Sequence, residues 1–242
     1  MINPVLKSRI IENFNHDWKF YKGDISDAFE VDFVDNDWRV LDLPHDWSIE
    51  GPFDSKWASA TGYLPAGIGW YRKRFTVPKT DQERKVQIYF EGIYNNSEVW
   101  VNGISIGKRP NGYISFYYDL SAIIHYGDEN VIAVKVDHSK YADSRWYTGS
   151  GIYRNVRLIK TEKLYIKPWG VYARATVLGE DLGSIDVEIS VMNDSPTSSK
   201  VIILSELYSK GKAVGHFEQS ITIPANEESL IQGKIEIVNP IL

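Results

Sequence analysis

The sequence predicts an all-β protein, in which a jelly-roll β-sandwich is followed by a smaller immunoglobulin-like β-sandwich. Three observations support this fold class. Apolar and polar residues alternate with a period of two, almost no segment has the helical period of about 3.6, and Gly, Asn and Pro turn signals separate the runs. Short strands joined by such turns are typical of antiparallel sandwiches.

The amino-acid composition and net charge limit the classes of partner that this protein is expected to bind. Hydrophobic residues make up 43% and charged residues 24% of the chain, as in ordinary globular proteins. The net charge of −5 argues against nucleic acid, and no apolar run reaches the ~20 residues of a membrane span. We therefore expect neither nucleic acid nor membrane as a partner. The absence of cysteine excludes disulfides and thiolate metal sites but leaves the compartment open: cytoplasmic, or periplasmic or secreted if a signal peptide was removed.

The first two loops carry polar residues near aromatic ones. In VDFVDNDW, Asp32, Asp35 and Asp37 lack the spacing of a calcium loop, and a solvated loop is the preferred interpretation. In LPHDWSIEGPF, His45 could be a base oriented by Asp46. Neighbours on an extended chain rarely face each other, so we favour Asp46 as an acceptor of backbone N–H groups in a turn that Trp47 anchors.

The next three segments are predicted to form strands. In YRKRF, alternation predicts that Tyr71, Lys73 and Phe75 share one face. It places Arg72 and Arg74 on a basic face that is solvated or forms cross-strand ion pairs, and the preceding Trp70 is expected in a core. EVWVNGISIG predicts a hairpin, because the dipeptide at 102–103, Asn-Gly, tolerates the positive φ of a type I′ turn. VIAVKVD also alternates with a period of two, which predicts a strand with Ile132, Val134 and Val136 on one face.

A seam near residues 161–168 predicts two domains, 1–165 and 166–242. Before the seam the chain is rich in Trp and long loops, and after about Val171 five strand-like runs contain no Trp. IDVEISVM alternates strictly, and the turn at 209–212 marks a hairpin. The second domain is shorter than the ~100 residues of a complete immunoglobulin-type domain.

The segment SRWYTGSGIYRNV raises the first question of function. Asp143 and Arg145 flank an aromatic pair that begins at Trp146, on a loop rich in small residues. An aromatic platform edged by charged hydrogen-bonding groups suits the C–H face and the hydroxyls of a sugar. The alternative has Arg145 paired with Asp143 and Trp146 covering the core, and composition does not decide between the two.

Four motifs closely resemble the N-terminal part of family 2 glycoside hydrolases, with the nearest likeness to the β-galactosidases of that family. They span roughly residues 13–158 and occur in the order LPHDWSIEGPF, GYLPAGIGWYRKRF, VWVNGISIGKRPNGYISFYYDLS and SRWYTGSGIYRNVRL. The resemblance implies a jelly-roll, sugar-binding-type domain, then an immunoglobulin-like domain, then a TIM barrel that carries two catalytic glutamates. A barrel needs ~250 residues, so we expect the chain to stop before it and to be inactive alone, although the parent would be a glycosidase.

The resemblance also implies a rim for the substrate site. The candidate rim residues are Asp143, Ser144, Arg145 and Trp146, since the loop before the SGIYR segment supplies an acidic residue to the galactose subsite in the family. Asp143 is the candidate for that role and for a neighbour of a sodium ion in the complete enzyme; we expect no other cofactor or metal, because the five histidines lack ligand spacing. The loop DSKWASAT, residues 54–61, is a second, unranked rim candidate.

Three functions compete at this stage. The first is a non-catalytic N-terminal part of a retaining, β-galactosidase-like enzyme, which frames the substrate site and docks on the barrel. The second is a free-standing carbohydrate-binding module, and the third is a structural adaptor whose aromatic residues bury a protein interface. The expected partners are a β-galactoside-type carbohydrate and the barrel; the oligomeric state stays open, a homo-oligomer being one alternative.

Overall fold

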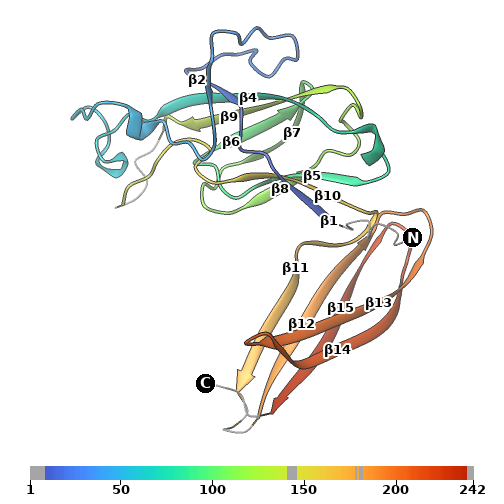
Figure 1. The fold of residues 1–242 in the computed structure, drawn as a ribbon. Coiled ribbons are helices and arrows are strands. Elements are labelled where there is room, and N and C mark those ends of the chain that lie inside the picture. The colour runs from blue at the N-terminus through green and yellow to red at the C-terminus, as the bar shows by residue number, and fades with distance from the viewer. Residues whose placement is uncertain (1–8, 141–145, 178, 180–181, 239–242) are drawn as a thin grey trace. The chain divides into compact units, whose positions relative to one another are not determined.

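The computed structural model describes residues 9–140, 146–177, 179 and 182–238 and divides the chain into two compact units, Met1–Lys160 and Thr161–Leu242. The predicted border at residues 165 and 166 lies slightly after this division. Nearly all regular structure consists of strands, so the all-β fold with sandwich-like sheets is confirmed (Figure 1). Within the described residues, no helix has the length and apolar character that crossing a membrane requires.

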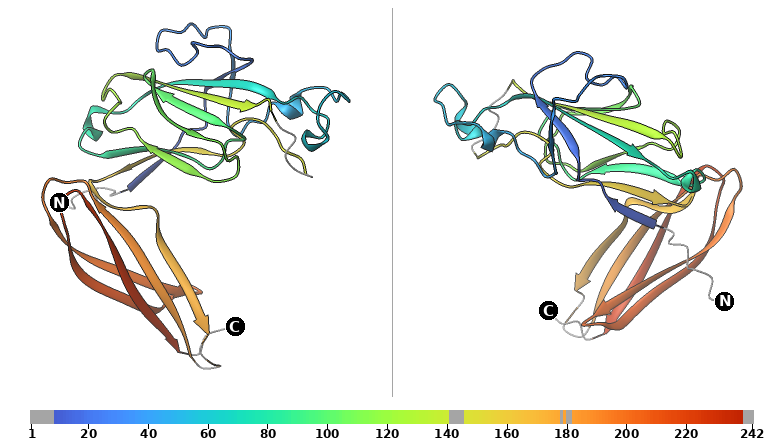
Figure 2. Two further views of the ribbon diagram at one scale, coloured as in Figure 1. Left: turned by 180° about the vertical axis from the view of Figure 1, so that it is seen from behind. Right: turned by 45° about the horizontal axis from the view of Figure 1, so that its top comes forward.

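The first unit is a jelly-roll sandwich of two sheets, seen as two layers in Figures 1 and 2. One sheet has the order β3-β2-β4-β9-β6-β7, and the other has the order β1-β10-β5-β8. The strands are β1 Arg9–Asn13, β2 Trp18–Lys22, β3 Arg39–Leu41, β4 Gly67–Thr76, β5 Lys85–Phe90, β6 Ser97–Val101, β7 Ile104–Arg109, β8 Phe116–Asp119, β9 Glu129–His138 and β10 Val156–Thr161. Three short 3₁₀ helices lie in the loops, η1 Ser48–Glu50, η2 Ser59–Thr61 and η3 Lys79–Asp81.

The main core fills the space between these two sheets. Strand β9 contributes Ile132, Val134 and Val136, which the alternation of VIAVKVD predicted to share a face, and β5 contributes Val86 and Ile88 from the opposite sheet. The Asn-Gly dipeptide forms the predicted hairpin between β6 and β7, with φ angles of 51° and 78°. Local alternation and turn chemistry therefore place the core strands correctly.

A second aromatic cluster lies on the outer face of the six-stranded sheet. Trp70 and Trp100 stack with their ring centroids 5.3 Å apart. The loop between β2 and β3 arches over this sheet, as Figure 1 shows, and contributes Ala28 and Trp38 to the cluster. Trp70 is thus buried as expected, but under a loop and outside the main core.

This covering loop corrects two predictions. Asp35 was expected in a solvated loop, yet its side chain is only 5% exposed and accepts hydrogen bonds from Arg72 Nε at 2.9 Å and Lys19 Nζ at 2.6 Å. Arg72 was expected on a solvated or cross-strand-paired face, yet its side chain is 1% exposed. This ion pair is buried because the loop folds back on the sheet. The periodicity of the sequence does not reveal that contact. Arg74, by contrast, pairs with Glu129 of the neighbouring strand at 2.6 Å, as predicted for a cross-strand pair.

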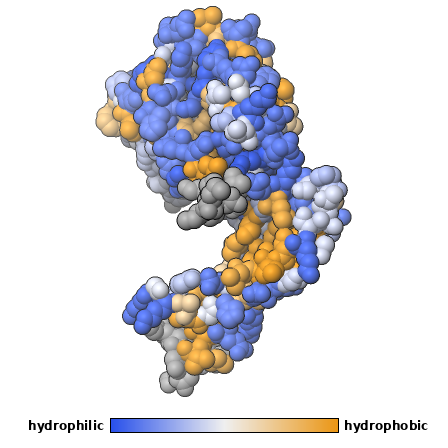
Figure 3. Space-filling view, turned by 45° about the vertical axis from the view of Figure 1, so that its right-hand side comes forward, coloured by the Kyte–Doolittle hydropathy of each residue, from blue (hydrophilic) through white to orange (hydrophobic). Residues whose placement is uncertain are grey.

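The second unit is a smaller immunoglobulin-like sandwich. Its sheets have the orders β11-β12-β15 and β13-β14. The strands are β11 Leu164–Val177, β12 Leu182–Asn193, β13 Ser199–Ser209, β14 Lys212–Ile223 and β15 Glu227–Val238. Val187, Ile189 and Val191 of IDVEISVM enter the core, as alternation predicted. Figure 3 shows hydrophobic side chains on the surface of this unit, where the exposed residues include Val171, Tyr172 and Ile202.

Candidate functional site

Loops from distant parts of the chain meet at one end of the first unit. The loop after β3 and the described segment that precedes β10 lie side by side there (Figures 1 and 2). The backbone N–H of His45 donates to Ile152 O at 2.9 Å, and that of Trp47 donates to Ser150 O at 3.1 Å. Tyr94 and Gly151 exchange two backbone hydrogen bonds, each 2.9 Å long. The segment around residues 150–152 is therefore held against two other loops.

Asp46 joins two of these loops. Its Oδ1 accepts hydrogen bonds from the backbone N–H of Ser48 at 2.9 Å and of Ser150 at 2.8 Å. Its Oδ2 accepts one from the Tyr147 hydroxyl at 2.6 Å. Burial and this carboxylate raise the pKa of Tyr147, so the phenol stays protonated and remains a donor. The prediction that Asp46 accepts backbone N–H groups is confirmed.

The backbone approaches Asp46 closely at Gly149. A Cβ added to this glycine would lie 2.1 Å from Asp46 Oδ2, which is far inside van der Waals contact. Only a residue without a side chain allows this approach. The small residues of the loop thus serve to bring its backbone against the carboxylate.

Beneath Asp46, buried polar side chains form a chain of hydrogen bonds. Ser48 Oγ donates to Pro65 O at 2.9 Å and lies 2.7 Å from Ser150 Oγ. Ser150 Oγ in turn lies 2.7 Å from His138 Nδ1. This chain connects the end of β9 to both loops, so the base of the rim is rigid.

His45 points away from Asp46 and into a different network. Its Nδ1 lies 2.7 Å from the Tyr71 hydroxyl, and its Nε2 lies 2.8 Å from Arg39 Nη2 and 3.2 Å from Glu50 Oε1. Burial lowers the pKa of His45, which the nearby Glu50 opposes only in part, so the ring is neutral near pH 7. Both ring nitrogens are occupied, and Trp47 beside it is 1% exposed. The interpretation of His45 as a base oriented by Asp46 does not hold.

Trp146 projects from the rim, 64% exposed. Its Nε1 donates a hydrogen bond to the Tyr113 hydroxyl at 3.1 Å. The Tyr113 ring packs edge-on against the buried Tyr94 with 5.3 Å between centroids, and Tyr94 packs edge-on against His138 at 5.0 Å. An exposed ring is thus connected through Tyr113 to the buried end of the sandwich. This exposure favours the aromatic platform over the alternative in which Trp146 covers the core.

The other predicted rim residues, Asp143, Ser144 and Arg145, lie outside the described residues. The second rim candidate, the loop at 54–61, carries its own local contacts: Lys56 pairs with Asp54 at 2.9 Å and lies 5.1 Å from the centroid of the Trp57 ring. Among the described residues, no group of three or more His, Asp or Glu side chains could hold a metal ion.

Sequence reasoning missed Tyr113 and Tyr94 as rim residues. One signal exists in the sequence, because Gly112 precedes Tyr113 in the NGYISF stretch. A Cβ on Gly112 would lie 2.2 Å from the Tyr94 ring, so this glycine lets the loop pass over that ring. The pairing of two loops that are far apart in the sequence could not be inferred without the tertiary structure.

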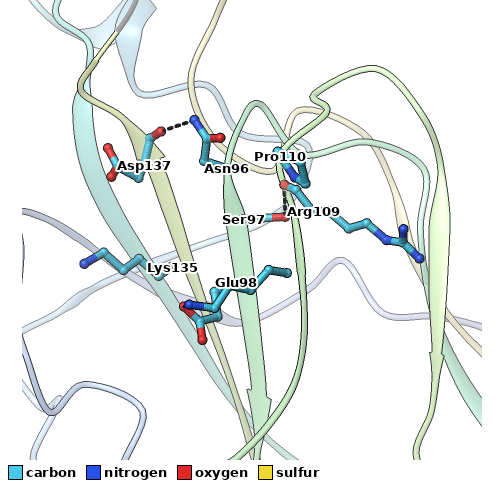
Figure 4. Close-up of a pocket in the computed structure, with 8 residues that line it drawn as sticks. Asn96, Ser97, Glu98, Arg109, Pro110, Lys135 and Asp137 are labelled. Atoms are coloured by element: carbon cyan, nitrogen blue, oxygen red, sulfur yellow. Dashed lines mark hydrogen bonds and ion pairs between the residues drawn. The ribbon is translucent and has the colours of Figure 1, made fainter.

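A shallow pocket of about 440 Å³ lies on the outer surface of β6, β7 and β9 (Figure 4). Asn96 Nδ2 donates to Asp137 O at 3.0 Å, and Figure 4 shows the Arg109 side chain directed away from Asp137. The two lysines of the pocket are already paired, Lys108 with Glu98 at 2.8 Å and Lys135 with Asp24 at 2.6 Å. Both lysines are therefore already engaged within the protein.

The described side chains of this loop cluster form no catalytic arrangement. The Asp46 carboxylate is fully engaged by three donors, and His45 has both nitrogens occupied. What remains available at the surface is the Trp146 ring with the Tyr113 hydroxyl beside it. A ring face with a neighbouring hydrogen-bonding group suits an amphipathic, hydroxyl-rich ligand.

Comparisons with known proteins agree with this description. A sequence model described as "Glycosyl hydrolases family 2, sugar binding domain" matches residues 11–162. A β-galactosidase of Bacteroides ovatus is 43% identical over 98% of this chain and 28% of its own length, and a putative β-glucuronidase of Formosa agariphila is 40% identical over 75% of this chain and 18% of its own length. The crystal structure of a glycosyl hydrolase family 2 member from Bacteroides cellulosilyticus superposes with a TM-score of 0.88 at 32% identity, covering 96% of this chain and 31% of that one. This chain therefore spans less than a third of the length of each of these relatives.

Proposed function

Because this chain belongs to glycoside hydrolase family 2, as its motifs indicated, we propose that it is the non-catalytic N-terminal part of a retaining β-galactosidase. In this proposal it frames the substrate site and docks on a catalytic barrel encoded further along the parent polypeptide. The observation that carries it is the exposed Trp146 ring, which Tyr113 supports at the edge of a rigid, hydrogen-bonded rim. Binding of carbohydrate is the function that this family domain and this rim chemistry share.

The proposed roles of this chain and of the barrel follow from the chemistry of glycoside hydrolysis. A retaining enzyme needs two carboxyl groups about 5 Å apart, one that attacks the anomeric carbon and one that protonates the leaving oxygen and then activates water. The described rim carboxylates, Asp46 and Glu50, instead hold loops and Arg39 in place. We therefore assign both chemical steps to the barrel and substrate orientation to this chain.

The first test is an assay of the purified 242-residue chain, produced in a host that lacks β-galactosidase. We expect no release of nitrophenol from 4-nitrophenyl β-D-galactopyranoside. Sustained hydrolysis that copurifies with the chain would overturn the proposal.

The second test uses the complete parent protein. Replacing Trp146 by Ala should raise KM for β-galactosides about three- to tenfold with a smaller change in kcat, because a rim contact that is equal in ground and transition state affects binding alone. Trp169→Ala is a matched control, since Trp169 is similarly exposed, at 59%, but belongs to the second unit. An unchanged KM in Trp146→Ala, or an enzyme that hydrolyses only β-glucuronides, would contradict the assigned rim or the assigned substrate.

The exposure of Trp146 also supports a second candidate, a free-standing carbohydrate-binding module. A module of this kind would bind galactose or β-linked galactosides through Trp146 without any barrel. Calorimetric titration of the chain and of its Trp146→Ala variant distinguishes the two functions. Saturable heat that disappears in the variant would favour the module.

A further inference from the structure

We propose that a pocket at the β2–β3 edge of the first unit binds one residue of a neutral saccharide. The pocket has a volume of about 430 Å³, within the range of about 300–1,000 Å³ that is usual for small-molecule sites. It is lined by the end of β2, the start of β3 and the loop around η1, and it shares no residue with the Trp146–Tyr113 pair. The inference does not depend on the proposed enzymatic function, because the pocket is complete within this chain.

Aromatic rings form the apolar wall of this pocket. Tyr21 and Trp38 stack with 5.5 Å between their centroids and an interplanar angle of 27°, and Tyr21 is 40% exposed. Deeper in the pocket, Phe20 and Trp47 stack at 5.6 Å and 24°. The C–H face of a pyranose packs well on exposed aromatic rings, whereas a strongly charged ligand would gain little from them.

Unpaired polar groups stand beside this wall. The side chains of Lys22 and Asp37 line the pocket, and neither forms an ion pair or a hydrogen bond within the part of the chain that the structure describes. The Lys22 ammonium and the Asp37 carboxylate thus offer donors and acceptors beside the aromatic wall, which fits a ligand with several hydroxyl groups.

The charges favour a neutral ligand over an acidic one. Arg39 Nη2 lies 2.8 Å from both carboxylate oxygens of Glu50, so this cation is already neutralised. Lys22 and Asp37 then contribute one positive and one negative charge. A carboxylate or phosphate would meet the repulsion of Asp37, while sugar hydroxyls can donate to Asp37 and accept from Lys22. The pocket on β6, β7 and β9 differs in that its lysines are paired within the protein.

The test is binding of methyl β-D-galactopyranoside and methyl β-D-glucopyranoside to the 242-residue chain, measured by saturation-transfer NMR and calorimetry. We expect saturable binding of at least one of these glycosides. Tyr21→Ala should weaken it by at least about tenfold, and Lys22→Ala and Asp37→Asn by about three- to tenfold each, because each change removes a contact worth about 1 kcal/mol. Tyr21→Phe keeps the ring and should retain binding within about threefold.

Matched variants separate this pocket from the rim. Trp146→Ala should leave the affinity within twofold of the unaltered chain, as should Tyr172→Ala in the second unit. Circular dichroism checks that each variant is folded. The proposal is overturned by the absence of saturation up to ~50 mM glycoside, by equal binding in a folded Tyr21→Ala variant, by loss of binding in Trp146→Ala, or by tighter binding of methyl glucuronide than of the neutral glycosides.

Discussion

The Oδ1 atom of Asp46 lies 2.8 Å from the amide nitrogen of Ser150, a residue 104 positions further along the chain. This hydrogen bond, together with those from Ser48 and Tyr147, holds the loop that carries Trp146 against the loop after β3. One carboxylate therefore adds three hydrogen bonds to the backbone contacts between these loops. The next two predictions concern this contact.

Replacing Asp46 by Ala should lower the free energy of unfolding of the first unit by about 2–4 kcal/mol, because buried donors lose a charged acceptor. Asp46→Asn should cost less, about 1–2 kcal/mol, since its amide oxygen can still accept from the backbone. Urea unfolding followed by tryptophan fluorescence measures both. Asp27→Ala is the control, because the exposed Asp27 side chain has no hydrogen bond or ion pair in the described structure, and it should stay within about 0.5 kcal/mol.

Gly149→Ala should lower the free energy of unfolding by about 1–3 kcal/mol, because the new methyl group overlaps Asp46 Oδ2 and must displace it or the loop. The same urea experiment measures this loss. Gly179→Ala is a matched change in the second unit, where no atom lies within 4 Å of the added Cβ. Equal stability of the two variants would mean that the loop and Asp46 do not pack as described.

Asp35→Ala should destabilise the first unit by about 3–5 kcal/mol, because it leaves Arg72 buried without its partner. The double variant Asp35→Ala/Arg72→Met removes both charges and should recover part of this loss. Thermal and urea unfolding of the single and double variants measure the coupling. A double variant that is less stable than the sum of its single changes would contradict the buried ion pair.

The free energy of unfolding should decrease at acidic pH because the Asp35 carboxylate becomes protonated. Burial opposes ionisation of this carboxyl group, but hydrogen bonds from Lys19 and Arg72 outweigh it and lower its pKa. Its contribution is therefore complete above about pH 4, the ordinary pKa of aspartate, and is lost as the pH falls through the lower pKa of the folded state. Urea unfolding between pH 7 and pH 2 should show this loss. The Asp35→Asn variant should lose less stability over the same range, and an identical pH profile would exclude Asp35 as a source.

The sequence by itself determined the strands, the turns and the family. Ile132, Val134 and Val136 alternate on one face, and Asn102-Gly103 supplies the positive φ angles of its turn; these features depend on residues close together in the chain. The role of Asp46 was also predictable, because one of its backbone donors, Ser48, is only two residues away.

Only the tertiary structure decided which distant segments share a site. The buried pairing of Asp35 with Arg72, the support of Trp146 by Tyr113 and the pocket beside Tyr21 and Trp38 each join loops or strands that no local pattern relates. The physical reason is that burial and hydrogen-bond satisfaction depend on what packs on a residue in space. An aspartate in a polar loop has the same sequence signature whether the loop stays in water or folds back over a sheet.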